Sequence, residues 1–443
     1  MLKVVKFGGS SMADAAQLRK VRDIILSDPA RTAVVVSAAG KRFSGDHKLT
    51  DLLYLCYAHL QYGVSCDSVF EMVRTRLLEI RDDLHLNVDL ESDLAALRQR
   101  METGISQDEL VSRGEYFSAR LMAALLDFPF LDAALWLRFG AGGEVDTETS
   151  YALLRQLAGD APFVTPGFYG SMPDGKIRTL TRGGSDITGA LAAAALEADV
   201  YENWTDVSGI LMADPRIVPE AKTIRRVTYS ELRELSYIGA QVLHEATVFP
   251  VREKNIPLNI RNTNDPAHPG TMIKESFDDS AETDEGFITG IAGKKDFTIL
   301  TVTKNGMSSR PDSIRRILEI FEKYSVPLSY APTGIDCFSA VVEESRLGGA
   351  RYAILADLQK ELKPDDIRVS EKIAVLAVVG RRMVFRSGSS GKIFAALGAH
   401  NINIRMISQG PEELNIIVGV DNRDFAPAMQ VLYQSFVKQE VKS

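Results

Sequence analysis

The stretch that most constrains the fold is 179–216, TLTRGGSDITGALAAAALEADVYENWTDVSGILMADPR. It opens with a basic residue, two glycines, a hydroxyl and an acid, and continues through an Ala/Leu-rich run at 189–198. This order predicts loop, helix, strand and loop. A helix that begins just after GGSD directs its free N–H groups at the loop, which makes the loop a candidate anion site. Asp186 either caps this helix or organises a cationic group, and the spacing leaves both interpretations open.

A similar strand, glycine turn and helix are predicted at the N-terminus. LKVVKF at 2–7 has β character, GGSS follows, and apolar residues recur at helical spacing through 13–26. Gly8 and Gly9 allow a tight turn and a close approach to a ligand. Lys6 comes at the end of the strand, where open α/β sheets bind ligands. The pattern matches neither the Walker A loop nor the dinucleotide fingerprint, so a plain turn stays the alternative.

Further strands and a helical insertion complete the first domain. TAVVVSAAG (32–40) suits a buried parallel strand that ends in small residues. DAALWLRF (132–139) and APFVTPGFYGS (161–171) are also predicted as strands, and residues from about 55 to 125 as an inserted helical bundle. SRGE at 112–115 is predicted to open a helix. Glu115 is then either an acid in the first turn or a carboxylate that binds an ammonium group.

Two motifs that suggest known sites are incomplete. GSMPDGK at 170–176 nearly fits the P-loop pattern, but Ile177 stands where Ser or Thr is needed, and Pro173 removes a backbone donor. We predict a hairpin turn at PDG instead. His244 and Glu245 lack the second histidine of a metal-binding helix, so a packed histidine is the better interpretation.

The C-terminal third contains an internal repeat. An acidic linker, KESFDDSAETDEG, predicts a domain boundary near 275–290. FTILTV (297–302) and IAVLAV (373–378) start 76 residues apart, SVPL aligns with NINI at the same offset, and FSAVV aligns with LNIIV without a gap. A period this long predicts two small domains, each with the order strand, helix, strand, strand, helix. The expected domains are 1–280, 290–365 and 372–443, the last two possibly nested.

Composition excludes several function classes. The net charge of −8 gives no basic surface for nucleic acid or anionic membranes. No apolar run is long enough to span a bilayer, and the three cysteines have neither metal nor disulfide spacing. The chain starts directly in a strand without an export leader, so we expect a cytoplasmic protein that binds neither nucleic acid nor membrane.

Five motifs together resemble the aspartokinase family. They are KFGGSS, SRGE, TRGGSD, WTDVSGILMADPR and NINIRMISQG, in the order and spacing of that family. The resemblance implies an α/β fold, the amino-acid-kinase three-layer sandwich with a mainly parallel sheet, followed by two ferredoxin-like ACT domains. It is strongest to the monofunctional, lysine-sensitive type. It implies transfer of phosphate from ATP, with Mg²⁺, to the side-chain carboxylate of L-aspartate.

The resemblance also implies roles for individual residues. Lys6 and Asp186 would be catalytic. The implied aspartate contacts are Ser37, Thr50, Glu115, Arg182, Gly183 and Ser185. The implied nucleotide contacts are Lys6, Gly8, Gly9, Ser10, Thr205, Asp206, Leu211, Arg216 and Gln241. An amino-acid effector, lysine first and threonine second, would bind at ACT interfaces near Met307, Ser308, Leu328, Ser329, Asn401 and Ile402, in a homodimer or dimer of dimers formed through these domains.

The chemistry is compatible with these residues. A carboxylate nucleophile with a pKa of about 4 is already ionised, so the reaction needs positioning and charge neutralisation rather than a general base. Two positions depart from the family pattern: Gln241 replaces a lysine that reaches the phosphates, and Leu211 replaces a tyrosine near the adenine. Another carboxylate kinase of this fold, such as a glutamate kinase, and a non-catalytic amino-acid-binding regulator stay as alternatives.

Overall fold

The computed structural model describes residues 1–159, 161–181, 183–240, 245–278, 288–310, 312–383, 387–410 and 414–438. The chain forms two compact units. The first comprises residues 1–210, 223–229 and 242–277, and the second comprises 211–222, 230–241 and 278–443. Among the described residues, no helix has both the length and the apolar character needed to cross a membrane.

The first unit is built on a seven-stranded sheet with strand order β3-β2-β1-β6-β8-β9-β7. The five strands from β3 to β8 are parallel, β9 runs antiparallel to β8, and β7 is parallel to β9. The strands are β1 (Lys3–Phe7), β2 (Arg31–Val36), β3 (Phe163–Pro166), β6 (Val200–Thr205), β7 (Arg226–Thr228), β8 (Leu258–Asn262) and β9 (Thr271–Lys274). A separate hairpin joins β4 (Tyr169–Ser171) and β5 (Ile177–Thr179), which confirms the turn predicted at PDG.

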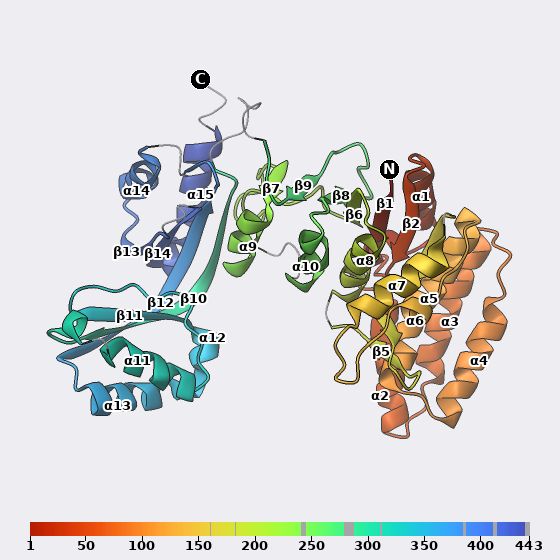
Figure 1. The fold of residues 1–443 in the computed structure, drawn as a ribbon, viewed down its shortest axis with the longest axis horizontal. Coiled ribbons are helices and arrows are strands. Elements are labelled where there is room, and N and C mark those ends of the chain that lie inside the picture. Colours follow the sequence, from red (N-terminus) through yellow and green to blue (C-terminus); the bar gives the residue numbers. More distant parts are fainter. Residues whose placement is uncertain are drawn as a thin grey trace. The chain divides into compact units, whose positions relative to one another are not determined.

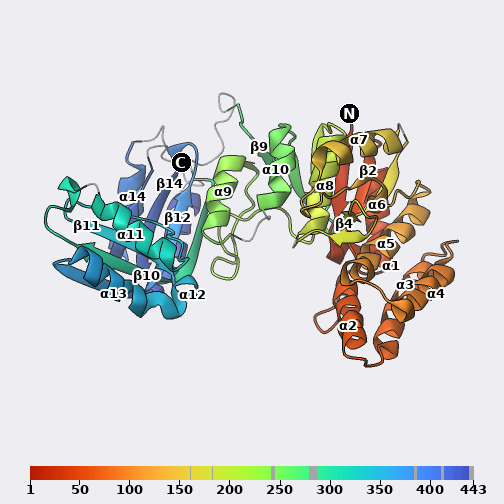
Figure 2. The same cartoon turned by 60° about the horizontal axis from the view of Figure 1, so that its bottom comes forward.

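Helices cover both faces of this sheet, which gives the three-layer amino-acid-kinase sandwich (Figure 1). On one face α8 contacts β1, β2 and β6 and is flanked by α7 and α10. On the other face one apolar core joins β1 and β2 to the helices from α1 to α5, and α2, α3 and α4 form a bundle beside α1 and α5 (Figure 2). The helices are α1 (Ala15–Leu26), α2 (Leu49–Gln61), α3 (Asp67–Asp83), α4 (Leu90–Thr103), α5 (Gln107–Leu126), α6 (Ala133–Trp136), α7 (Thr147–Ala158), α8 (Gly184–Ala195) and α10 (Glu245–Glu253).

The two C-terminal repeats share one five-stranded antiparallel sheet, with strand order β11-β10-β12-β14-β13. The long strands β10 and β12 pair along their whole length. One core joins β10 and β11 to α11 and α13, and another joins β12 and β14 to α14 and α15 (Figure 1). The elements of this unit are α9 (Tyr229–Tyr237), β10 (Gly290–Thr303), α11 (Asp312–Lys323), β11 (Cys337–Glu343), α12 (Glu344–Leu347), α13 (Arg351–Leu362), β12 (Asp366–Val379), α14 (Ser389–Ala399), β13 (Ile404–Ser408), β14 (Asn415–Asp421) and α15 (Phe425–Tyr433).

Four local predictions were wrong. The run 132–139 is not a strand, because Asp132 caps a helical turn, α6, by accepting a hydrogen bond from the Ala134 N–H. SRGE lies inside α5 rather than at its start, because Ser106 caps that helix. SVPL forms no strand. The last strands of the two repeats are offset by 78 residues rather than 76, because Phe297 pairs with Glu343 whereas Ile373 pairs with Asp421.

Candidate active site

The carboxyl ends of three neighbouring parallel strands meet at one edge of the first unit's sheet. Phe7, the last residue of β1, is in register with Val36 of β2 and Trp204 of β6. Gly8 and Ser37 directly follow β1 and β2, and Thr205 is the last residue of β6, so these three residues are adjacent. This is the edge at which open α/β sheets bind their ligands.

Lys6 and Asp186 form the charged centre of this edge. Lys6 Nζ lies 2.5 Å from Asp186 Oδ1, and the lysine side chain is only 8% exposed. Asn203 Nδ2 donates to the same carboxylate oxygen at 3.1 Å, and the Tyr201 hydroxyl donates to the Asp186 backbone carbonyl at 3.0 Å. The ammonium is thus fixed at the base of the site, because its partner is itself held from β6.

Asp186 does not cap α8. The helix begins at Gly184, so Asp186 belongs to its first turn rather than to a preceding loop. The N-cap is Gly183, with a φ of 82°, and no side chain caps the helix. The free N–H groups of α8 therefore remain available at the site, and of the two interpretations of Asp186 the structure favours the pairing with a cation.

The glycine turn after β1 is packed too closely for side chains. The Gly8 N–H donates to the Trp204 carbonyl at 2.9 Å, and the Gly40 N–H donates to the Gly9 carbonyl at 2.8 Å. A Cβ atom on Gly40 would lie 2.5 Å from the Gly9 carbonyl carbon, and one on Gly9 would lie 3.0 Å from the Ala38 carbonyl oxygen. The turn, followed by the short helix η1 (Gly9–Met12), is therefore braced by the loop after β2.

Glu115 faces this region from within α5. Its side chain is buried, and its Oε2 atom has no hydrogen-bond partner among the described residues. Burial raises the pKa of this carboxyl to about 8, although the Ala38 N–H, Lys6 and Arg113 oppose the rise. Without a ligand the group is mainly protonated at neutral pH. A buried acid with one oxygen left unpaired is suited to receive a cationic group.

The remaining predicted aspartate contacts lie in the same unit. A Cβ atom on Gly114 would lie 2.9 Å from Ala38 Cβ and 3.5 Å from Thr50 Cγ2, so α5 and the start of α2 are close beside the loop after β2. Ser185, in the first turn of α8, is so close to Gly167 that a Cβ atom there would lie 2.7 Å from Ser185 Cβ. Arg182 lies outside the described residues.

The predicted nucleotide contacts are divided between the units. Thr205 ends β6 and Asp206 follows it, and the threonine hydroxyl donates to the aspartate carboxylate at 3.2 Å. Leu211 and Arg216 belong to the second unit, where the segment 211–222 packs on the core around α14 and α15. The Arg216 guanidinium is exposed and pairs with Asp214 at 2.6 Å. Gln241, like His244, lies outside the described residues.

Sequence reasoning missed Asn203 and Gly40. Asn203 is a buried amide in β6, beside the buried Glu202, and stands in register with Lys6. A polar residue so close to the carboxyl end of a predicted strand, two positions before Thr205, could have been recognised as a candidate site residue. Gly40 was noticed only as a small residue, because its role depends on a contact with Gly9 that no local pattern reveals.

The predicted effector residues are divided between two cores of the second unit. Met307 is buried in the core of α11 and α13, and Leu328 packs against it. The Ser308 N–H donates to the Ile335 carbonyl, and the Ser329 N–H to the Val341 carbonyl. Ile402 is buried in the core of α14 and α15 and follows Asn401, which has a φ of 57°. The two groups therefore belong to different cores of this unit.

Comparison with known proteins agrees with this architecture. The amino acid kinase family model matches residues 1–262, and an ACT domain model matches residues 376–436. Aspartokinase 3 of Bacillus subtilis is 35% identical over 451 residues, which cover 98% of both chains. The crystal structure of Clostridium acetobutylicum aspartate kinase is 44% identical and superimposes with a TM-score of 0.88, covering 98% of this chain and 99% of that one.

Escherichia coli aspartokinase III has been solved in two complexes, one with aspartate and ADP and one with lysine and aspartate. The TM-scores are 0.71 and 0.72 and the identities 27% and 26%, over 98% of this chain and 99% of each of those chains. The chain therefore belongs to the aspartokinase family, and its activity is the ATP-dependent phosphorylation of aspartate.

Proposed function

We propose that Lys6, the turn Gly8–Ser10 and the N-terminus of α8 bind the phosphates of ATP. The observation that carries this proposal is the 2.5 Å contact between Lys6 Nζ and Asp186 Oδ1, beside a turn that opens with two glycines. Turn amides and a helix N-terminus donate to phosphate oxygens, and the ammonium compensates the charge that shifts during transfer. Thr205 and Asp206 complete the nucleotide contacts in this proposal.

Aspartate binds on the side of Glu115 and Thr50. Its α-ammonium group pairs with the Glu115 carboxyl, whose Oε2 atom has no partner among the described residues. Arg182 clamps the α-carboxylate by its fork geometry. Ser37, Gly183 and Ser185 contact the rest of the substrate. This arrangement leaves the side-chain carboxylate directed toward the phosphates.

The chain's residues bring two anions together and hold them. An oxygen of the side-chain carboxylate attacks the γ-phosphorus; the new P–O bond forms as the bond to ADP breaks, giving 4-phospho-L-aspartate and ADP. No proton has to be removed, since the nucleophile is ionised. Lys6 stabilises the charge on the transferring group, and Asp186 keeps the ammonium in place.

The donor set fits a magnesium ion that arrives with the nucleotide. The described parts of the chain contain no group of three or more acidic, histidine or cysteine side chains that could hold a metal ion. Mg²⁺ commonly keeps several waters and binds phosphates with one or two carboxylates. Asp186 and Asp206 are the carboxylates we assign to it. When bound, the ion neutralises phosphate charge and orients the γ-phosphoryl group.

A hydroxylamine assay tests the reaction. Incubated with ATP, Mg²⁺, aspartate and hydroxylamine, the protein is expected to form aspartyl hydroxamate, because the acyl phosphate product reacts with the amine. Glutamate in place of aspartate is expected to give no product above background, since an added methylene displaces the carboxylate from the phosphates. Equal or better turnover of glutamate would favour a glutamate kinase, and no turnover of either would favour a non-catalytic regulator.

Lysine is the effector we expect, in a cytoplasmic homodimer or dimer of dimers formed through the ACT domains. The lysine complex of the Escherichia coli protein and the two repeats of the second unit support this proposal. Lysine binding that favours a less active state would raise the aspartate KM or lower kcat. We predict inhibition by millimolar lysine in the hydroxamate assay, with threonine weaker. Rates unchanged by either amino acid would contradict the prediction.

A further inference from the structure

One arginine of the helical bundle donates hydrogen bonds to the backbone of the active-site loops. Arg76 lies in α3, and its side chain is buried. Its guanidinium donates to the His47 carbonyl at 2.6 Å and to the Ala13 carbonyl at 3.2 Å, and it also donates to the Gly40 carbonyl. Ala13 follows η1, whereas Gly40 and His47 lie at the two ends of the loop between β2 and α2. A single side chain therefore joins them.

Each of the three acceptor residues lies beside a part of the proposed site. Ala13 follows η1, the short helix that continues the glycine turn. Gly40 donates its N–H to the Gly9 carbonyl and has no space for a side chain against Gly9. His47 lies two residues before α2, whose second residue is Thr50. A shift of the guanidinium would therefore be passed to both the phosphate turn and the aspartate side.

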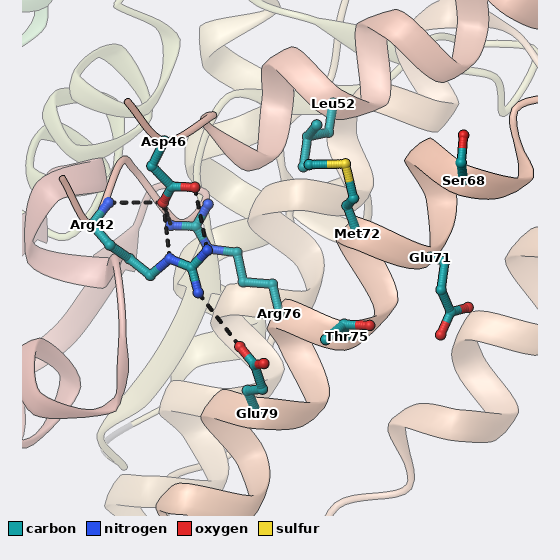
Figure 3. A pocket seen from close by; sticks show the side chains of 9 residues that line it. All are labelled: Arg42, Asp46, Leu52, Ser68, Glu71, Met72, Thr75, Arg76 and Glu79. Atoms are coloured by element: carbon teal, nitrogen blue, oxygen red, sulfur yellow. Dashed lines mark hydrogen bonds and ion pairs between the residues drawn. The ribbon is translucent and has the colours of Figure 1, made fainter. Parts of the chain in front are cut away.

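A carboxylate balances the buried charge. Asp46 Oδ2 lies 3.3 Å from the Arg76 guanidinium and accepts hydrogen bonds from the backbone N–H and Nε of Arg42, as Figure 3 shows for the side chains. The Arg42 guanidinium holds the pKa of the Asp46 carboxyl well below its usual range. Asp46 is therefore ionised at neutral pH and can balance the charge of the buried guanidinium. This network, called here the Arg76 cluster, consists of Arg42, Asp46 and Arg76.

The number of acceptors explains the choice of arginine. A guanidinium offers five donors in a rigid planar fork, whereas a lysine ammonium offers a compact charge on a flexible stem. Only the fork can serve three carbonyls and a carboxylate from one position. Burying it is expensive unless these contacts are made, and apolar residues of equal volume often stabilise a fold better. The stability of the bundle alone therefore does not account for an arginine here.

We propose that Arg76 is a positioning residue for phosphoryl transfer, which acts through Gly40 and Gly9 to hold the amides of the glycine turn in place. It touches neither substrate. The inference rests on the proposed role of that turn in phosphate binding. It adds that the position of the turn also depends on a residue of the helical insertion, and not only on the sheet.

The substitution Arg76→Ala is expected to lower kcat about tenfold, because displacements well below 1 Å already weaken positioned catalysis. Free guanidinium, added well below the concentration that unfolds the protein, is expected to restore much of the loss, since it can occupy the vacated cavity. Potassium chloride at the same concentration should not. Guanidinium is a denaturant, so a variant that is only less stable would lose further activity instead.

Arg74→Ala is the matched control. Arg74 lies on the same helix, is half-exposed, and pairs with Glu71 one turn away at 2.9 Å. Its loss should leave kcat within about twofold, as expected for a surface ion pair. If Arg76→Ala does not fold, Arg76→Lys takes its place, since it keeps the charge but cannot reach all three carbonyls; kcat should fall at least about threefold, without gain from guanidinium.

A wild-type kcat in Arg76→Ala or Arg76→Lys would overturn the inference. So would a loss in Arg76→Ala that guanidinium deepens and that follows the unfolded fraction. The result can be separated from a failure of the proposed site. Full activity of Lys6→Ala would remove the phosphate site itself, whereas an inactive Lys6→Ala beside a fully active Arg76→Ala would remove only the role of Arg76.

Discussion

Replacement of Lys6 by alanine is expected to lower kcat by at least about 100-fold, or about 3 kcal/mol of transition-state stabilisation. The ammonium lies at the end of β1, 2.5 Å from Asp186, and its side chain is almost fully buried. A charge held in a dry site needs little reorganisation when negative charge shifts during the transfer, so its effect on the transition state is large. Steady-state kinetics in the hydroxamate assay measure the change.

Lys3→Ala is the control for this experiment. Lys3 lies on the same strand and is also an ion-paired lysine, bound to Asp28 at 2.7 Å. Both variants lose one positive charge from β1, but only Lys6 is assigned to the site. The control should keep kcat within about threefold, because Lys3 is the first residue of β1 and pairs with Asp28 and Glu202 at the end of the strand away from the site. Comparable losses in both variants would show that the strand's charge or stability matters, and not the position of Lys6.

A second variant separates loss of charge from loss of folding. Lys6→Ala leaves Asp186 without its cation, which can itself destabilise the site. The double variant Lys6→Ala/Asp186→Asn removes the unpaired charge, and its unfolding free energy should exceed that of Lys6→Ala. Its kcat should remain low. Recovery of activity in the double variant would mean that Lys6 serves only to neutralise Asp186.

The strand ends of the site could be predicted from the sequence because each is marked locally. A β-prone run followed by glycines or small residues indicates a strand that ends where the backbone approaches a ligand or a neighbouring loop closely. KFGGSS and TAVVVSAAG both carry this signal, and the parallel register then brings Gly8 and Ser37 to one edge. The pairing of Lys6 with Asp186 follows from that register together with the start of α8.

The environment of Glu115 could not be predicted in the same way. SRGE was placed at a helix start, although the chain contains a capping signal earlier, Ser106 followed by Glu109 three residues later. The Ser106 hydroxyl does accept the Glu109 N–H, so α5 starts before SRGE and Glu115 lies in its interior. Its burial depends on contacts with the loop after β2, at residues distant in sequence. No periodicity in α5 alone could reveal that an acid would be enclosed there.

The predicted offset of 76 residues between the last strands of the two repeats was wrong for a related reason. Alignment of FSAVV with LNIIV conserved the alternation of buried and exposed positions, and a two-residue shift conserves it equally well. Only the pairing of Ile373 with Asp421 fixes the register. Alternation identifies a strand's buried face, but the length of the preceding turn decides which residue stands opposite which.

Glu115→Gln is expected to raise the KM for aspartate about 100-fold while making the ligand-free protein more stable. The amide keeps the size of the side chain but cannot pair with the α-ammonium of aspartate, and loss of one partner of a buried ion pair costs about 3 kcal/mol or more. kcat at saturating aspartate should change much less, because the ammonium does not take part in the transfer. Glu109→Gln, on the exposed side of the same helix and paired with Arg100, should leave the KM for aspartate unchanged.

The stability gain follows from the pKa of Glu115. Burial raises the pKa from 4.5 in the unfolded chain to about 8 in the fold. Between these two values the native state holds a proton that the unfolded chain has released, so stability is highest below the lower value and falls as pH rises toward the upper one. Each pH unit in this window costs about 1.4 kcal/mol, and a neutral glutamine avoids the cost. Urea unfolding at pH 8 should therefore show Glu115→Gln to be more stable by at least about 2 kcal/mol.

The same group should set how aspartate binding depends on pH. Only the ionised carboxyl can receive the ammonium, so the KM for aspartate should fall as pH rises toward the Glu115 pKa of about 8 and then level off. In Glu115→Gln this dependence should disappear. In the wild-type protein, bound aspartate should lower the pKa of Glu115, so that this carboxyl releases its proton when aspartate binds at neutral pH. Measuring that proton release gives a test that does not depend on turnover. A wild-type KM that does not change with pH, together with an unchanged KM in Glu115→Gln, would place the substrate ammonium elsewhere. The acid would then be a buried group that destabilises the fold without binding aspartate.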